Sequence, residues 1–158
     1  VGSLRRDGGG CTRYEVVGTV MDGRMDTVQA AGLRGKLDEF REELARRDAI
    51  ARAYDAGLAE TVKVRVRVPG SESAWAIYAI LLKDPAERAP LQARLKDRGV
   101  PSAIYYPLPL HKQPAYRDHH DGTALPVSED LAQRILALPI HPELTDDDVA
   151  RVIAAVRG

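Results

Sequence analysis

The chain has 158 residues, of which 44% are hydrophobic and 29% are charged. This composition is ordinary for a globular protein, and the length has room for one domain. Its 23 basic and 23 acidic residues cancel, which argues against nucleic acid or an anionic membrane as a partner. The single cysteine, Cys11, excludes an internal disulfide and favours a reducing cytoplasm, and no apolar run approaches the ~20 residues of a membrane span.

Residues 1–22 predict a flexible lead-in rather than a packed element. They contain the run Gly8-Gly9-Gly10, and only Tyr14 to Val17 suggest a short strand. Because the sequence begins with Val1 rather than Met, we expect either a fragment or a reading frame that is translated from an alternative start.

The next segment predicts one long helix from Asp26, which is a good N-cap, to about Leu58. Apolar residues follow the three-four spacing of one helix face, interrupted at Arg47. They are Leu33, Leu37, Phe40, Leu44, Ala51, Tyr54 and Leu58. A helix of this length typically links two domains or crosses a subunit interface, and the glycines near its start suit close packing against another element.

The rest of the chain alternates between strand and helix patterns. Three strands are expected, over 61–68 with a basic outer face (Lys63, Arg65, Arg67), over 74–82, and over 102–106. Helices are expected over 87–98, 128–138 and 146–156. This order predicts an α/β domain in which a small, mostly antiparallel three-stranded sheet is covered by helices.

Several conventional site patterns are weak or missing. His119-His120 has no further ligands at a helical spacing, so a polar surface loop is favoured over a metal site. Cys11 has no base beside it in sequence, and no glycine pattern for nucleotides occurs. The basic face of the first strand is more typical of a solvated surface than of a phosphate site.

Two stretches remain as candidates for binding. At the turn before the long helix, Arg24 can offer a planar two-pronged donor to a carboxylate or phosphate. In the second stretch, Tyr105 and Tyr106 end a strand and are followed by a stiff Pro-X-Pro segment and the pair His111-Lys112. Hydroxyl groups and an ammonium on a rigid loop suit a polar ligand such as a sugar nucleotide.

At these stretches the sequence resembles the DegT/DnrJ/StrS aminotransferases, which depend on pyridoxal phosphate (PLP) and have the aspartate-aminotransferase fold (fold type I). The motifs that carry the resemblance occur in order along the chain. They are Leu4-Arg5-Arg6-Asp7-Gly8 with Tyr14-Glu15, Arg24-Met25-Asp26 with Gln29-Ala30-Ala31, Arg47 with Ile50-Ala51 and Tyr54, Tyr106-Pro107-Leu108-Pro109-Leu110-His111, and Leu138-Pro139-Ile140-His141-Pro142 with Leu144-Thr145.

The resemblance implies that residues 1–25 are the tail of a large PLP-binding domain and that residues 26–158 are the C-terminal small domain. In the family, the large domain carries the lysine that binds PLP, and no lysine here resembles it, so the resemblance assigns no catalytic residue and no covalent PLP to this chain. It implies cofactor contact at Asp22, where the family usually has Asn. It implies substrate contact at Arg24 and Tyr106. Together with the loop's polar groups, the candidate substrate residues are Arg24, Tyr105, Tyr106, His111 and Lys112.

The expected function is therefore part of a cytoplasmic aminotransferase that moves an amino group, from glutamate, to a nucleotide-linked keto-sugar. The expected partner is a second copy or a chain that carries the missing large domain. The alternative is a non-catalytic dimerisation or scaffold module, or a subunit that completes another chain's active site. A sugar-nucleotide binder that acts alone is a further alternative.

Overall fold

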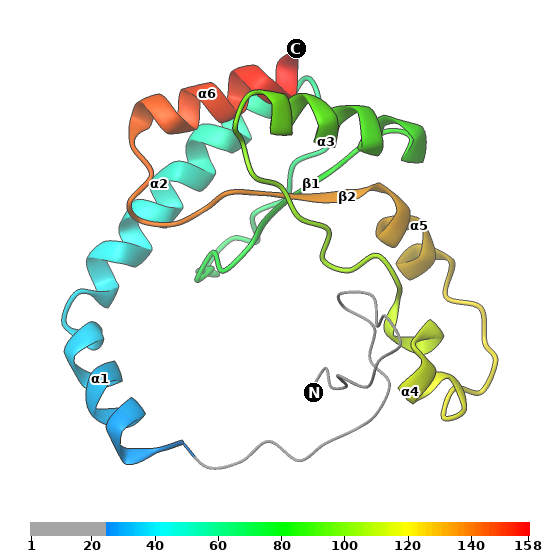
Figure 1. The fold of residues 1–158 in the computed structure, drawn as a ribbon, viewed down its shortest axis with the longest axis horizontal. Coiled ribbons are helices and arrows are strands. Elements are labelled where there is room, and N and C mark those ends of the chain that lie inside the picture. The colour runs from blue at the N-terminus through cyan, green and yellow to red at the C-terminus, as the bar shows by residue number, and fades with distance from the viewer. Residues whose placement is uncertain (1–24) are drawn as a thin grey trace.

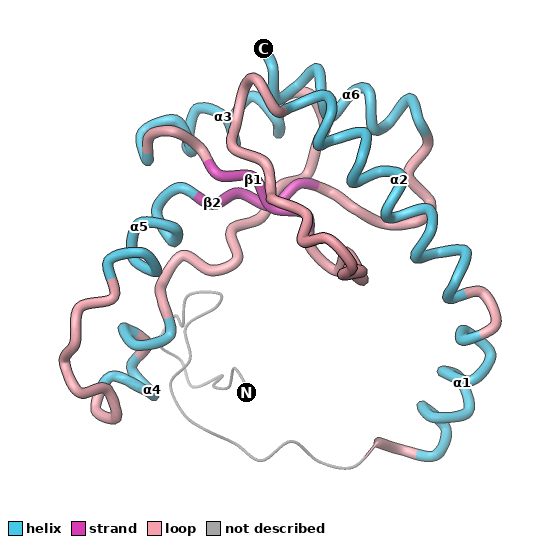
Figure 2. Tube along the Cα trace, turned by 180° about the vertical axis from the view of Figure 1, so that it is seen from behind, coloured by secondary structure: helices cyan, strands magenta, loops and turns pink. Residues whose placement is uncertain are grey.

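The computed structural model describes residues 25–158, in which helices surround a small sheet (Figure 1). In chain order the elements are α1 (Thr27–Leu37), α2 (Phe40–Leu58), β1 (Tyr78–Leu81), η1 (Pro85–Glu87), α3 (Arg88–Asp97), η2 (Leu110–Lys112), α4 (Pro114–Arg117), α5 (Pro126–Arg134), β2 (Ile135–Leu138) and α6 (Asp146–Arg157). Helices α2, α3 and α6 cover one side of the sheet, and α1 extends from the end of α2 away from it (Figures 1 and 2). The α/β class expected from the sequence is confirmed.

The core lies between the sheet and the three helices that cover it. Helix α2 contributes Ile50, Tyr54 and Leu58, each of which is at most 1% exposed. Tyr54 packs its ring against Tyr78 of β1, with the ring centroids 4.9 Å apart. Its hydroxyl donates to the carbonyl oxygen of Pro139 over 2.9 Å, so the polar end of this buried side chain is satisfied.

The three-stranded sheet expected from the sequence is not confirmed. Among the described residues, β1 pairs with β2 in an antiparallel sheet, from Tyr78 opposite Leu138 to Leu81 opposite Ile135. The other two expected strands are each reduced to a single bridge, Lys63 to Leu81 and Ala103 to Ala137. The segment 135–138 was expected to end a helix, but its apolar run Ile-Leu-Ala-Leu forms a strand, which pairs with β1 and is bridged by Ala103 at Ala137. This pairing leaves Leu136, Ala137 and Leu138 buried.

The single long helix is also not confirmed: Asp26 is the expected N-cap, but the helix is divided into α1 and α2 at Asp38 and Glu39. The charges favour two helices. Arg34 and Lys36 occupy the last turn of α1, and Glu42 and Glu43 occupy the first turn of α2. Basic groups stabilise the negative end of one helix dipole and acidic groups the positive end of the next, whereas a continuous helix would gain from neither.

Helices α3 and α6 follow the expectations closely, whereas α5 begins at Pro126 and already ends at Arg134. Gly99 adopts a positive φ of 70° directly after α3, the left-handed conformation expected of a glycine in this position. At the start of α6, the Thr145 side chain accepts from the backbone of Asp148, and the Asp148 side chain accepts from the backbone of Thr145. This reciprocal capping explains why α6 begins where the sequence predicts. The proposed division at residue 25 involves residues outside the described range and stays a prediction.

Candidate functional site

The segment from Tyr105 to Leu125 folds back on itself because prolines and one buried amide shape it. Pro107 and Pro109 stiffen its start, and Pro114 occupies the first turn of α4, where a missing N–H costs nothing. Gln113 is only 3% exposed, and its side-chain amide donates to the carbonyl oxygen of Leu108 over 3.2 Å. The backbone carbonyl of Gln113 accepts from Tyr116 and Arg117, so this residue fastens η2 to α4.

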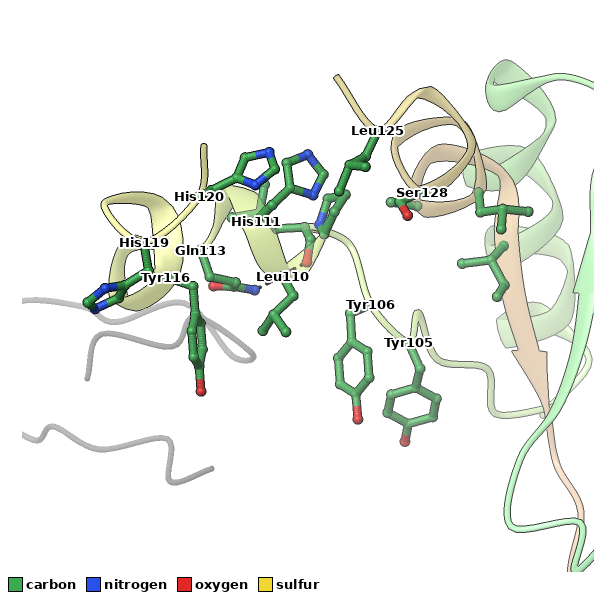
Figure 3. A pocket seen from close by; sticks show the side chains of 15 residues that line it. Tyr105, Tyr106, Leu110, His111, Gln113, Tyr116, His119, His120, Leu125 and Ser128 are labelled. Carbon is green, nitrogen blue, oxygen red and sulfur yellow. Dashed lines mark hydrogen bonds between the residues drawn. The ribbon is translucent and has the colours of Figure 1, made fainter. Parts of the chain in front are cut away.

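A cavity of about 1010 Å³ lies between this loop and α5. Its apolar wall includes Leu108, Leu110 and Leu131, and its polar groups come from tyrosine, histidine, glutamine and serine side chains (Figure 3). The polar lining residues are Tyr105, Tyr106, His111, Gln113, Tyr116, His119, His120 and Ser128. An apolar cavity of this size with several convergent polar groups is typical of a small-molecule site.

Tyr105 and Tyr106 form one side of the cavity. Their rings meet edge to face with centroids 5.7 Å apart, and their hydroxyl groups point to the same side of the loop, as does that of Tyr116 (Figure 3). Tyr106 is 57% exposed. The three hydroxyls therefore present hydrogen-bonding groups over an aromatic surface, which suits a ligand with many hydroxyl groups.

Glu129 of α5 gathers the two basic residues of the loop. The ammonium of Lys112 donates to one carboxylate oxygen over 2.5 Å, and Nε2 of His111 lies 3.2 Å from the other. The hydrogen bond from Lys112, and then that from His111, lowers the pKa of Glu129. The ring of His111 also packs against that of His120 at 5.1 Å, so His111 holds the loop in place from two directions.

The structure thus brings together three of the predicted substrate residues, Tyr105, Tyr106 and His111, around one cavity. Lys112 is adjacent but does not line it, because its ammonium is directed to Glu129. Asp22 and Arg24 lie outside the described residues, so their predicted roles stay predictions. Sequence reasoning missed Gln113, Tyr116 and Ser128, and it placed His119 and His120 on a plain surface loop. The signal for them was weak, because only the proline-directed fold of the loop brings them to the cavity.

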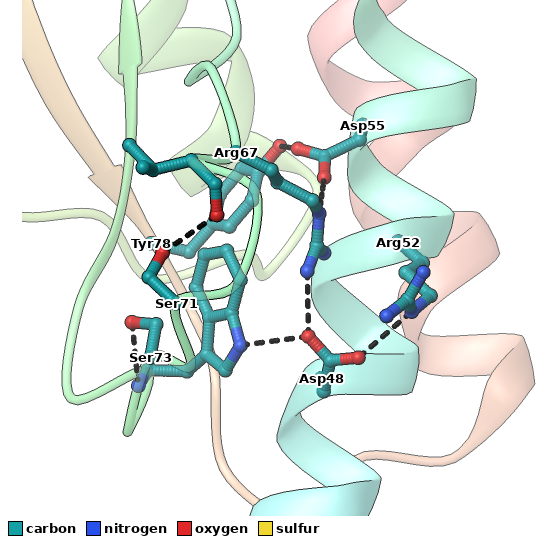
Figure 4. Close-up of polar contacts among 9 residues, drawn as sticks. Asp48, Arg52, Asp55, Arg67, Ser71, Ser73 and Tyr78 are labelled. Atoms are coloured by element: carbon teal, nitrogen blue, oxygen red, sulfur yellow. Dashed lines mark hydrogen bonds and ion pairs between the residues drawn. The ribbon is translucent and has the colours of Figure 1, made fainter.

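Of the three basic residues expected on a strand face, Lys63 and Arg65 are exposed, whereas Arg67 belongs to a structural network. Six residues that are joined by hydrogen bonds form a set that we call the Arg67 network (Figure 4): Asp48, Arg52, Asp55, Arg67, Trp75 and Tyr78. Arg67 donates to Asp48 over 2.6 Å and to Asp55 over 2.9 Å, and its guanidinium lies 4.7 Å from the centre of the Trp75 ring. The network therefore ties the segment between Lys63 and Trp75 to α2, and Arg67 is engaged within the chain.

The described residues form one wall of a polar-ligand site but do not fit a complete PLP site. Every lysine of the chain is exposed, and none lines the cavity.

Over residues 25–158, no cluster of histidine, cysteine, aspartate or glutamate side chains is arranged to hold a metal ion. Across the same range, no helix has the length and apolar content that crossing a membrane requires.

Known proteins place this architecture in one family. The chain matches the DegT/DnrJ/EryC1/StrS aminotransferase family over residues 2–157. It is 37% identical over 148 residues to a UDP-2-acetamido-2-deoxy-3-oxo-D-glucuronate aminotransferase of Pseudomonas aeruginosa, a match that covers 91% of this chain and 39% of that protein. It is 34% identical to a dTDP-3-amino-3,4,6-trideoxy-alpha-D-glucose transaminase of Streptomyces venezuelae, over 91% of this chain and 38% of that protein.

The fold is similar to that of solved members. A crystal structure of a DegT DnrJ EryC1 StrS aminotransferase from Brucella abortus matches with a TM-score of 0.79 and 44% identity, over 94% of this chain and 39% of that chain. The chain thus spans about two-fifths of the length of the relatives it matches. With matches in both sequence and fold over nearly all of its length, the chain belongs to the DegT/DnrJ/EryC1/StrS aminotransferase family.

Proposed function

We propose that this chain is the small-domain part of a PLP-dependent aminotransferase that transfers an amino group from glutamate to a nucleotide-linked keto-sugar. One observation carries the proposal. The loop that bears the family motif Tyr-Pro-x-Pro-Leu-His lines the cavity of about 1010 Å³, to which this stretch contributes two tyrosines and a histidine. A motif that only shaped the fold would not need to gather hydroxyl groups at a cavity.

The cavity residues have distinct roles in this proposal. Tyr105 and Tyr106 donate to and accept from sugar hydroxyls, and the apolar wall excludes water behind the sugar. His111 positions the loop through Glu129. The Lys112 side chain is 45% exposed and forms an ion pair with Glu129. When a ligand binds, the ammonium of Lys112 can leave Glu129 and pair with an anionic group of the ligand instead. By the family resemblance, Arg24 contacts the substrate and Asp22 faces the cofactor.

PLP, when it is bound, supplies the electron sink for amino transfer. The exposed lysines of this chain are poor candidates for binding it covalently, because Schiff-base lysines are usually desolvated. We therefore assign PLP to a partner that carries the family's large domain, and to this chain the orientation of the sugar. Because the relatives' own names give UDP-linked and dTDP-linked sugars, we infer a nucleotide-linked sugar for this site as well.

The test is reconstitution with the lysine-bearing part of the Pseudomonas aeruginosa relative. The two polypeptides are co-expressed, and release of 2-oxoglutarate from glutamate is measured with PLP and that relative's UDP-linked 3-oxo sugar. Tyr106→Phe should lower the rate about tenfold, since one hydrogen bond to the ligand is worth roughly 1.4 kcal/mol. Lys112→Gln should raise the sugar concentration that gives the half-maximal rate. The matched control is Lys83→Gln, which lies outside the loop in sequence.

A scaffold role makes the opposite prediction. If this chain only held its partner in shape, the Tyr106 and Lys112 variants would have the same rates as the unaltered complex. Loss of activity in the Lys83→Gln control as well would point to a general folding defect, and the free energy of unfolding of each variant separates that outcome from a loss of ligand contact.

A further inference from the structure

The ion pair between Lys112 and Glu129 connects the two walls of the cavity. Lys112 belongs to the loop and follows His111 in the sequence, whereas Glu129 belongs to the first turn of α5 and follows Ser128. His111 and Ser128 both line the cavity (Figure 3), and neither member of the ion pair does. The pair therefore holds its two charges beside the site without filling it.

The two carboxylate oxygens of Glu129 are engaged by different donors. Oε2 accepts from the ammonium of Lys112 over 2.5 Å, and Oε1 lies 3.2 Å from Nε2 of His111. The His111 side chain is only 11% exposed, and its ring packs against that of His120. Because His111 is fixed in this way, Lys112 can leave the carboxylate while His111 still holds it in place.

The attraction between Lys112 and Glu129 is weak enough for a ligand to replace. Within the described part of the chain, their side chains are 45% and 32% exposed, so water reaches the pair. An ion pair that water screens changes an equilibrium constant by about fivefold at most. A diphosphate group carries more charge and more acceptor oxygens than a carboxylate does. The flexible stem of Lys112 lets its ammonium follow such a group.

The charges around the cavity favour an anionic ligand. Of the described residues that line it, none is acidic and three are histidines. The hydrogen bond from Lys112, and then that from His111, lowers the pKa of Glu129, so the carboxylate beside the cavity is ionised at neutral pH. A ligand that pairs with Lys112 must therefore displace a charged group that belongs to the chain itself.

We propose that Glu129 is a specificity-determining residue whose carboxylate occupies Lys112 until the diphosphate of a nucleotide-linked sugar replaces it. A free sugar has no anion to exchange, so the cavity selects nucleotide-linked sugars. The nature of this ligand rests on the proposed function, whereas the exchange at Lys112 rests on the contacts of Glu129. Competition predicts that removal of the Glu129 charge tightens anion binding. A carboxylate that only supported the loop would give the opposite sign, because its removal would weaken binding.

The experiment uses the full chain without PLP and without amino transfer, so its failure is distinct from a failure of the proposed function. Inorganic diphosphate is titrated into the protein, and the NMR signals of the His111 ring give the half-saturating concentration. The variants are Glu129→Gln and Lys112→Gln. The matched control is Asp130→Asn on the same helix, because it removes an equal charge from a carboxylate that pairs with Arg134 instead.

We expect Glu129→Gln to lower the half-saturating concentration of diphosphate about threefold relative to the control, within the range of exposed ion pairs. Lys112→Gln should raise it about threefold or more, because the cation itself is lost. The neutral sugar N-acetylglucosamine should not distinguish Glu129→Gln from the unaltered chain. Weaker diphosphate binding in Glu129→Gln, or an equal gain in Asp130→Asn, would overturn the exchange. Diphosphate that binds to none of the four forms would overturn it as well.

Discussion

At the scale of single residues, Asp48 shows how the loop that follows α2 is held. It accepts hydrogen bonds from Arg67, Arg52 and the indole nitrogen of Trp75. The hydrogen bond from Arg67 is the largest cause that lowers the pKa of Asp48 from 3.8 to about 2. The ionised form is therefore favoured in the folded chain, and this residue links folding to pH.

The direction of that linkage follows from the lowered pKa. The unfolded chain takes up a proton on Asp48 at a higher pH than the folded chain does, so the stabilisation is complete above about pH 4 and is lost as the pH falls through about 2. Asp48→Asn removes the carboxylate that accepts these hydrogen bonds and should therefore lower the free energy of unfolding near pH 7. The expected loss is only about 1 kcal/mol, because solvent screens these partly exposed pairs. Urea unfolding followed by Trp75 fluorescence should show that difference shrink below about pH 4. If the difference in free energy of unfolding between the two forms did not change with pH, the role assigned to Asp48 would be contradicted. The control is Asp97→Asn.

Asp22 gives a second prediction at this scale. The family resemblance places an amide donor where this chain has a carboxylate, which repels a phosphate group. In the reconstituted complex, Asp22→Asn should strengthen PLP retention by roughly 1–3 kcal/mol, the usual scale for a hydrogen bond to a charged group. Dialysis against buffer without PLP measures this retention. Equal loss of PLP from both forms would show that Asp22 does not face the cofactor.

At the scale of elements, α2 and α6 approach closely at Gly57. Gly57→Ala should be destabilising by about 1 kcal/mol, because overpacking against Ile153 costs more than the gain in helix propensity. In an Ile153→Ala background the same change should become stabilising, and a double-mutant cycle measured by chemical unfolding gives the coupling. Gly35→Ala, where a Cβ meets nothing within 4 Å, is the control. Additive effects of the Gly57 and Ile153 changes would contradict close packing at this crossing.

The elements also show what the sequence could and could not predict. Helices α3 and α6 follow from local signals, Gly99 and the Thr145 cap, which act within a few residues. The strand β2 was missed because pairing with β1, more than fifty residues earlier in the chain, decides its conformation. For the site, the sequence pointed to Tyr106 and His111 within the motif and to Tyr105 just before it. Gln113 and His120 reach the cavity only through the tertiary fold of the loop.

At the scale of the whole molecule, the described chain has a packed half and an open half. Helices α2, α3 and α6 bury one side of the sheet, while α1 and the Tyr105–Leu125 loop lie beyond this core (Figures 1 and 2). The open half contains both the cavity and α1, which has no buried residue among those described. This arrangement fits the proposal that the chain forms its own core and completes an active site with another part of the family fold.

The most direct test of that account is the activity of a chimera. In the Pseudomonas aeruginosa relative, the segment matched by this chain is replaced with residues 1–158, and amino transfer from glutamate to the relative's UDP-linked 3-oxo sugar is measured. The account predicts amino transfer that falls about tenfold with Tyr106→Phe, since roughly 1.4 kcal/mol corresponds to a tenfold change in rate. A folded chimera that retains PLP but transfers no amino group, or whose rate is indifferent to Tyr106→Phe, would contradict it.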